Sequence, residues 1–215
     1  RGFVRNLTTG EIAAQVLYFA RKLREQNAHV TNVVFMGMGE PLLNDDAVWR
    51  AIHNLNDREG LALGARRFTI STVGIVPGIQ RLAREELPVG LAVSLHAPTD
   101  ELRNRLVPIN RKYPLDTLIK TCRTYAETTR RRVTFEYAMI NGVNDTLAMA
   151  DALARRLQGF LCHVNLIPVN PVPDLPHGPS PRERIMAFET RLRHLGVNAT
   201  LRVGMGIDIQ AGCGQ

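Results

Sequence analysis

Six short apolar segments separated by segments of helical periodicity constrain the fold more than any other feature of the sequence. The apolar segments cover roughly residues 33–36, 68–70, 90–93, 133–139, 163–167 and 198–203. Between them, apolar residues recur at intervals of three and four, as amphipathic helices require. The first such helix, which opens the chain, has Thr8 and Glu11 in the spacing of a capping box. Strict alternation of strands and helices predicts an α/β fold with a parallel sheet, either open and doubly wound or curled into a barrel.

The first apolar segment leads into the sequence Gly37-Met38-Gly39-Glu40-Pro41. Its unbroken hydrophobicity predicts a strand that is buried on both faces. The glycines allow a sharp turn or a close approach of the backbone to a ligand. Glu40 then lies at the carboxyl end of the strand, where α/β sheets and barrels bind their ligands. A carboxylate there can hold an amine or a ribose hydroxyl, and the alternative is a solvated glutamate in an ordinary turn.

Polar or reactive residues follow the ends of most of the predicted strands. They are Glu40, Ser71, Ser94, His96, Asn144, Asn170 and Cys213. A barrel assembles one site from the loops at the carboxyl ends of its strands, so this placement favours a barrel. The sequence contains neither a G-x-G-x-x-G after the first strand nor a P-loop.

Each of these residues also has a purely structural interpretation. Serine hydroxyls at strand ends can bind a carboxylate or an amine, but they are also common turn residues. His96 can act as an acid, a base or a ligand, or it can bond a loop carbonyl. Asn170 can bind the edge of a ligand or form an Asx turn before Pro171. Glu136, inside an apolar strand, must face a pocket or a partner charge because a lone buried carboxylate is costly, and we favour a pocket.

Three cysteines, Cys122, Cys162 and Cys213, lie far apart in the sequence. An odd and sparse set favours a reducing compartment over a disulfide framework, and no pair has a close C-x-x-C spacing that would suggest a metal site. Cys213 lies among small residues that cannot pack a large core. Its thiol is therefore either an accessible nucleophile or a passive surface cysteine.

The 27 lysines and arginines exceed the 20 aspartates and glutamates, which gives a net charge of +7. This excess favours a polyanionic partner, most simply nucleic acid. The basic clusters lie at residues 66–67, 103 with 105, 111–112, 130–132 and 155–156. Because only 6% of the residues are aromatic, recognition of RNA by shape and phosphate fits better than stacking on many bases. No apolar run has the length of a membrane span.

Several motifs, taken in order, strongly resemble the radical S-adenosylmethionine RNA methyltransferases of the RlmN/Cfr family. They include Gly37-Met38-Gly39-Glu40-Pro41-Leu42, Ser71-Thr72, Ser94-Leu95-His96-Ala97, Val107-Pro108-Ile109-Asn110, Asn165-Leu166-Ile167-Pro168 and Ala211-Gly212-Cys213-Gly214-Gln215. The resemblance runs essentially from end to end. It implies a partial (β/α) barrel of the radical-SAM type over residues 1–203, followed by a Gly-rich segment, 204–215, that carries Cys213.

The resemblance also implies an activity and a site. The reaction is methylation of an adenine ring carbon, C2 in preference to C8, in ribosomal RNA and also in transfer RNA. S-adenosylmethionine and a [4Fe-4S] cluster are the cofactors, and a flavodoxin or ferredoxin is the electron donor. Cys213 matches the cysteine that first takes the methyl group. The positions that match cofactor-binding residues are Gly39, Glu40, Ser71, Ser94, Leu95, His96 and Asn170. The family further implies a cytoplasmic monomer without a membrane anchor.

The sequence departs from the family at one important point. The C-x3-C-x2-C loop that binds the cluster is absent, and the resemblance places it just before Arg1. We therefore expect that the first strand and the cluster loop are missing, and that this fragment alone is inactive and binds no metal. Two other interpretations stay open: an RNA-binding barrel that has lost the cluster loop, and an unrelated barrel lyase or isomerase that uses Glu40 and His96.

Overall fold

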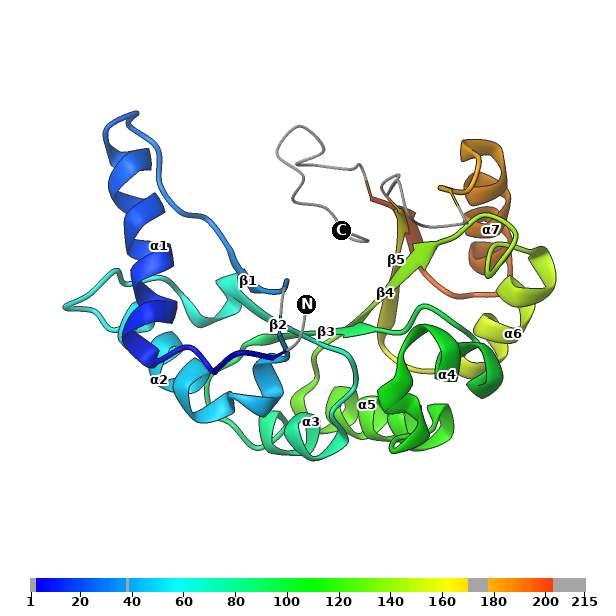
Figure 1. Cartoon of the computed structure of the whole chain (residues 1–215), viewed down its shortest axis with the longest axis horizontal. Coiled ribbons are helices and arrows are strands. Elements are labelled where there is room, and N and C mark those ends of the chain that lie inside the picture. The colour runs from blue at the N-terminus through cyan, green and yellow to red at the C-terminus, as the bar shows by residue number, and fades with distance from the viewer. Residues whose placement is uncertain (1–2, 38, 170–177, 203–215) are drawn as a thin grey trace.

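A single six-stranded parallel sheet forms the centre of the protein in the computed structural model, which describes residues 3–37, 39–169 and 178–202. The strands are β1 (Val33–Phe35), β2 (Phe68–Thr72), β3 (Gly90–Ser94), β4 (Val133–Met139), β5 (Cys162–Pro168) and β6 (Ala199–Leu201). Each strand pairs in parallel with the next one along the chain. Figure 1 shows that the sheet is curved and that the helices lie on its outer, convex side.

The strand order decides between the two predicted architectures. A doubly wound sheet reverses direction at a switch point, whereas here the order is β1 to β6 without reversal. Among the described residues β1 and β6 do not pair, so the sheet stays open. The prediction of a partial barrel is confirmed.

Seven α-helices precede or separate the strands, as the predicted alternation requires. They are α1 (Thr9–Arg24), α2 (Asp45–Asn56), α3 (Val76–Leu82), α4 (Asp100–Leu106), α5 (Leu115–Thr129), α6 (Leu147–Leu157) and α7 (Arg182–His194). Three short 3-10 helices were not predicted: η1 (Pro41–Leu43), η2 (Ala65–Arg67) and η3 (Pro108–Arg111). None of the helices in the described part of the chain combines the length and the apolar character that a membrane crossing requires.

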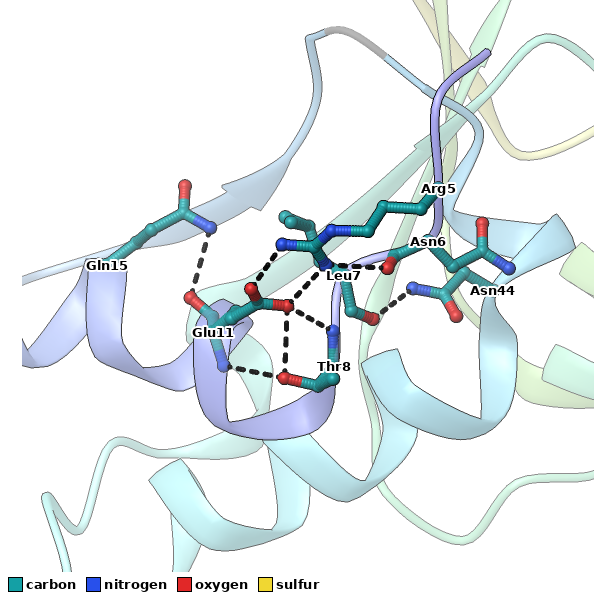
Figure 2. A network of polar contacts seen from close by, with 7 residues as sticks. All are labelled: Arg5, Asn6, Leu7, Thr8, Glu11, Gln15 and Asn44. Carbon is teal, nitrogen blue, oxygen red and sulfur yellow. Dashed lines mark hydrogen bonds and ion pairs between the residues drawn. The ribbon is translucent and has the colours of Figure 1, made fainter.

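The start of α1 shows how strongly local sequence fixes a helix end (Figure 2). The Thr8 hydroxyl accepts a hydrogen bond from the Glu11 amide, and a Glu11 carboxylate oxygen accepts one from the Thr8 amide at 2.8 Å. Arg5 binds the same carboxylate with both terminal nitrogens. The Asn44 side chain, at the N-cap of α2, makes no capping hydrogen bond to that helix and donates to the Leu7 carbonyl at 2.9 Å. The predicted capping box is confirmed, and Asn44 ties the entry of α1 to the entry of α2.

The two faces of the sheet differ in chemistry because side chains alternate along each strand. The face toward the helices is apolar and fully buried, with residues such as Phe68, Ile70, Leu91, Val93, Val133, Phe135, Val164 and Leu166. The concave face carries small and polar residues, including Ser71, Ala92, Ser94, Thr134, Glu136, His163 and Asn165. In register, Ser94 pairs with Glu136 and Glu136 pairs with Asn165.

The expectation that the first strand is buried on both faces is wrong. Val34 and Met36 are 49% and 39% exposed, whereas Val33 and Phe35 pack against the core. The reason is the open concave side, which no helix covers in the described part of the chain (Figure 1). An unbroken apolar run therefore did not mean burial on both faces here.

Candidate functional site

Glu40 lies directly after β1 and joins this strand to its neighbour. Its Oε1 accepts a hydrogen bond from the Leu42 amide at 3.0 Å, and its Oε2 accepts one from the Val73 amide, just past β2, at 2.7 Å. Burial raises the pKa of Glu40 above its usual value, although the two amide hydrogen bonds oppose the rise. The carboxylate is thus held in one position at the carboxyl edge of the sheet.

The glycines beside Glu40 adopt the backbone conformation that the sequence predicts. Gly37 and Gly39 have φ angles of +131° and +112°, which side chains disfavour. No described atom lies within 4 Å of the place where a Cβ would stand on either residue. The turn is therefore open on that side, and a ligand can approach the backbone next to Glu40.

Arg103, in α4, fastens the ends of β2 and β3 together. Its side chain is fully buried and donates to the carbonyls of Val73 at 2.7 Å, Ser94 at 3.0 Å and Leu95 at 3.1 Å. A fourth hydrogen bond, of 2.9 Å, reaches Asn110 Oδ1. Burial lowers the pKa of Arg103 to about 10, so the guanidinium stays charged at neutral pH. The sequence grouped Arg103 with possible phosphate contacts, and the structure corrects this to a role in positioning the strand ends.

Ser71, Ser94 and Leu95 lie together at the ends of β2 and β3 but face different ways. Ser71 was expected just after its strand, but it is the penultimate residue of β2. Its side chain faces the concave side and is 6% exposed. Ser94 ends β3 and is half-buried on the same side. The Leu95 side chain is fully buried in the core, so only the backbone of Leu95 can contact a ligand on the concave side.

His96 follows Leu95 with a φ of +60°, an uncommon conformation for a residue other than glycine. Its Nδ1 accepts a hydrogen bond from the Ala138 amide at 3.1 Å, which joins β3 to β4. Burial lowers the pKa of His96 to about 4, and the nearby charge of Arg103 acts in the same direction. A neutral ring that accepts at Nδ1 carries its proton on Nε2. His96 is therefore suited to donate one hydrogen bond to a ligand, and it is poorly suited to exchange protons at neutral pH.

Asn144 completes the link between β3 and β4. Its Oδ1 accepts from the Ile140 amide at 2.8 Å, and its Nδ2 donates to the carbonyls of His96 at 2.8 Å and Ala138 at 2.6 Å. The residue is fully buried. All of its polar atoms are thus engaged within the loops, and Asn144 is a structural residue of the site rather than a ligand contact.

Glu136 places a second carboxylate on the concave face, in register with Ser94. Its Oε1 accepts a hydrogen bond from Asn165 at 3.1 Å, whereas its buried Oε2 has no partner among the described residues. Burial raises the pKa of Glu136. The side chain faces the interior of the barrel, as the pocket interpretation requires.

A continuous chain of hydrogen bonds therefore connects the carboxyl ends of the first four strands. Glu40 connects β1 to β2, Arg103 connects β2 to β3, and His96 with Asn144 connects β3 to β4. Among the predicted site residues, the structure brings Gly39, Glu40, Ser71, Ser94 and His96 to this edge. Asn170 and Cys213 lie outside the described residues. Sequence reasoning missed Arg103 as a positioning residue, because no pattern distinguishes it from the exposed Arg105 in the same helix.

The described residues fit one of the two expected cofactors. The half-buried Glu40 carboxylate, the serine hydroxyls and an open glycine turn form a donor and acceptor set that suits the amino group and hydroxyls of S-adenosylmethionine. A [4Fe-4S] cluster does not fit: Cys122 and Cys162 are buried, and burial raises the pKa of their thiols to about 12 and about 11. No group of three or more His, Cys, Asp or Glu in the described part of the chain can hold a metal.

Comparisons with known proteins agree with this geometry. A protein-family model described as "Radical SAM superfamily" matches residues 4–153. The chain is 49% identical over 225 residues to a "Probable dual-specificity RNA methyltransferase RlmN" of Chloroflexus aurantiacus, with 100% of this chain and 60% of that protein covered. The chain thus spans about three fifths of the length of this curated relative.

Two solved structures have the same fold. A radical SAM methyltransferase from Sphaerobacter thermophilus is 56% identical, with a TM-score of 0.97 over 100% of this chain and 63% of that chain. Streptococcus suis SuiB bound to S-adenosylmethionine has a TM-score of 0.60 over 96% of this chain and 46% of that chain, and its 13% identity supports the fold alone. The chain therefore belongs to the radical SAM superfamily, and within it the chain is similar to the relative named RlmN.

Proposed function

We propose that the whole protein methylates an adenine ring carbon, most simply C2, in ribosomal RNA and in transfer RNA, with S-adenosylmethionine as the methyl donor. The Chloroflexus aurantiacus relative is named a dual-specificity RNA methyltransferase, and this name supports RNA as the substrate and two kinds of RNA as targets. Enzymes of this superfamily use S-adenosylmethionine and a [4Fe-4S] cluster. The observation that carries the proposal is the position of Glu40, a fixed and partly buried carboxylate beside an open glycine turn.

In this proposal the carboxyl edge of the sheet holds the cofactor. The Glu40 carboxylate pairs with the ammonium group of S-adenosylmethionine, because an opposite charge in a partly desolvated site is strongly favoured. The hydroxyls of Ser71 and Ser94 and the Nε2 proton of His96 are available for its other polar groups, as are the backbone of Gly39 and the amide of Asn170. Leu95 contributes through its backbone. S-adenosylmethionine would supply a methyl group on a sulfonium, which a thiolate readily accepts.

Cys213 is the proposed methyl carrier, and the segment 204–215 is the proposed unit that carries it. The Cys213 thiolate would attack the methyl carbon, the methyl–sulfonium bond would break with its electron pair passing to the departing S-adenosylhomocysteine, and a methyl thioether would form. Direct transfer from the sulfonium to an amidine-like adenine carbon would be slow, because that carbon is a poor nucleophile. The cluster ligands are not among the residues of this chain, so we assign no step to the cluster. On the resemblance alone, we propose a cytoplasmic monomer that receives electrons from a flavodoxin or ferredoxin.

The first test is Cys213→Ala in the whole protein. We expect methyl transfer from methyl-labelled S-adenosylmethionine to ribosomal RNA to be abolished, because the carrier sulfur is lost. Cys122→Ala is the matched control, since Cys122 is fully buried and its raised pKa keeps the thiol protonated. Transfer that persists in Cys213→Ala would exclude the carrier role.

The second test is Glu40→Gln, measured by calorimetry with S-adenosylmethionine. We expect at least a tenfold loss of affinity, since a charged pair contributes about 1.5 kcal/mol or more. In the wild type the affinity should also fall with falling pH, because the raised pKa of Glu40 brings its protonation closer to neutrality. Glu86→Gln, at an exposed position, is the control. A wild type that binds RNA but no S-adenosylmethionine would favour the RNA-binding barrel instead.

A further inference from the structure

Four arginines surround a cavity at the opposite, amino-terminal edge of the sheet. The cavity has a volume of about 620 Å³ and is lined by Arg66, Thr69, Pro88, Gly90, Leu91, Thr129, Arg130, Arg131, Arg132 and Thr134. Arg66 comes from η2, just before β2, and residues 130–132 connect α5 to β4. We call this cavity the arginine basin. Segments more than sixty residues apart in the sequence thus contribute to one basic site.

The backbone holds two of these arginines in defined positions. Arg130 is the C-cap of α5 and has a φ of +55°, a left-handed position that glycine or asparagine usually occupies. Arg131 is half-buried and donates to the Val89 carbonyl at 2.7 Å, an acceptor that also receives the Tyr125 hydroxyl at 3.1 Å. The backbone conformation of Arg130 and the hydrogen bond of Arg131 therefore fix part of the arginine basin in a defined geometry.

The charge in the basin is not neutralised by the protein. No carboxylate lines the cavity, and none of the ion pairs among the described residues involves the four arginines. Burial lowers the pKa of Arg131, and the positive charge of Arg66 acts in the same direction. Like charges so arranged repel one another unless an anion lies between them.

We propose that the arginine basin binds phosphate groups of the RNA backbone, at a site separate from the methyl-transfer site. Guanidinium forks match phosphate oxygens in a bidentate manner, and the hydroxyls of Thr69 and Thr134 add neutral donors. Because parallel strands all run the same way, the basin and the cofactor site lie at opposite ends of the strands, and Gly90 in the basin is about 13 Å from Ser94 along β3. The basin would therefore hold a part of the RNA that is remote from the modified base. This inference rests on the proposed RNA substrate.

The test is the salt dependence of RNA binding by the whole protein, measured without cofactor on a ribosomal RNA fragment. In the double variant Arg66→Gln/Arg132→Gln we expect weaker binding, and a plot of log affinity against log salt that is less steep by roughly 1.5, since each phosphate contact contributes about 0.7 to 0.9. The control is Lys120→Gln/Arg155→Gln, which removes the same charge from exposed positions on the outer helices.

Three outcomes would overturn the inference. An unchanged slope in the Arg66/Arg132 variant, or an equal change in the control, would show that the basin makes no specific contact with RNA. Loss of binding to polyglutamate with unchanged RNA binding would instead assign the basin to an acidic protein partner. The proposed methyltransferase function is tested by a separate assay of methyl transfer. A protein that binds RNA through the basin but transfers no methyl group would overturn the methyltransferase proposal and leave the basin proposal standing.

Discussion

The two edges of the sheet use polar side chains in opposite ways. At the carboxyl edge, the polar groups of Glu40, Arg103 and Asn144 are engaged with backbone groups of neighbouring strands. At the amino edge, the arginine basin gathers four positive charges without a carboxylate. These three side chains are bonded within the protein, whereas the second edge keeps its charge available for another molecule.

The difference follows from burial. Arg103 and Asn144 are fully buried, so their hydrogen-bonding groups must find partners inside the protein. Arg66 and Arg132 are exposed, and water satisfies their donors until an anion replaces it. Substitutions of Arg103 and Asn144 should therefore affect folding, and substitutions in the basin should affect binding.

The largest expected effect is that of Arg103→Ala. The change leaves the carbonyls of Val73, Ser94 and Leu95 without this donor and opens a cavity in the core. We expect a loss of about 3 kcal/mol or more in the free energy of unfolding, measured by urea denaturation. Arg105→Ala, at an exposed position of the same helix, should change it by less than about 0.5 kcal/mol. Equal effects of the two variants would refute the proposed contrast between buried and exposed arginines.

An intermediate effect is expected from the protonation of His96. Folding lowers the pKa of His96 from 6.5 to about 4, so the unfolded chain binds this proton more tightly. The contribution of neutral His96 to the free energy of unfolding is therefore complete above pH 6.5. It declines as the pH falls toward 4, and it declines no further below pH 4. In His96→Asn, whose side-chain oxygen can replace the Nδ1 acceptor, the free energy of unfolding should depend less on pH in this range. A pH dependence identical to that of the wild type would show that other groups cause it.

The smallest expected effect on stability is that of Arg66→Gln in the basin. Removing one of several mutually repelling charges should leave the free energy of unfolding within about 0.5 kcal/mol of the wild type, with a slight gain at low salt. Denaturation at two salt concentrations measures this. A clear loss of stability would mean that Arg66 supports the fold and would remove the contrast between the two edges.

Much of the fold followed from local patterns in the sequence. The alternation of apolar and amphipathic segments predicted the six strands and the helices between them, and the pair Thr8 and Glu11 predicted the start of α1. The glycine turn before Glu40 was also predicted, because only a few residues with unusual backbone freedom can form it. The predictions for Asn170 and Cys213 rest on family resemblance, and these residues lie outside the described part of the chain.

The sequence by itself determined the elements, their order and the residues near the strand ends, because periodicity and turn chemistry act over a few positions along the chain. Tertiary structure alone decided which polar residues act inside the protein and which face outward. Arg103 and Arg105 are indistinguishable in the sequence, yet one is fully buried and the other exposed. The arginine basin likewise exists only because β2 and β4 bring Arg66 and residues 130–132 to the same edge. Burial and long-range juxtaposition depend on how the sheet curves and packs, and no local pattern encodes them.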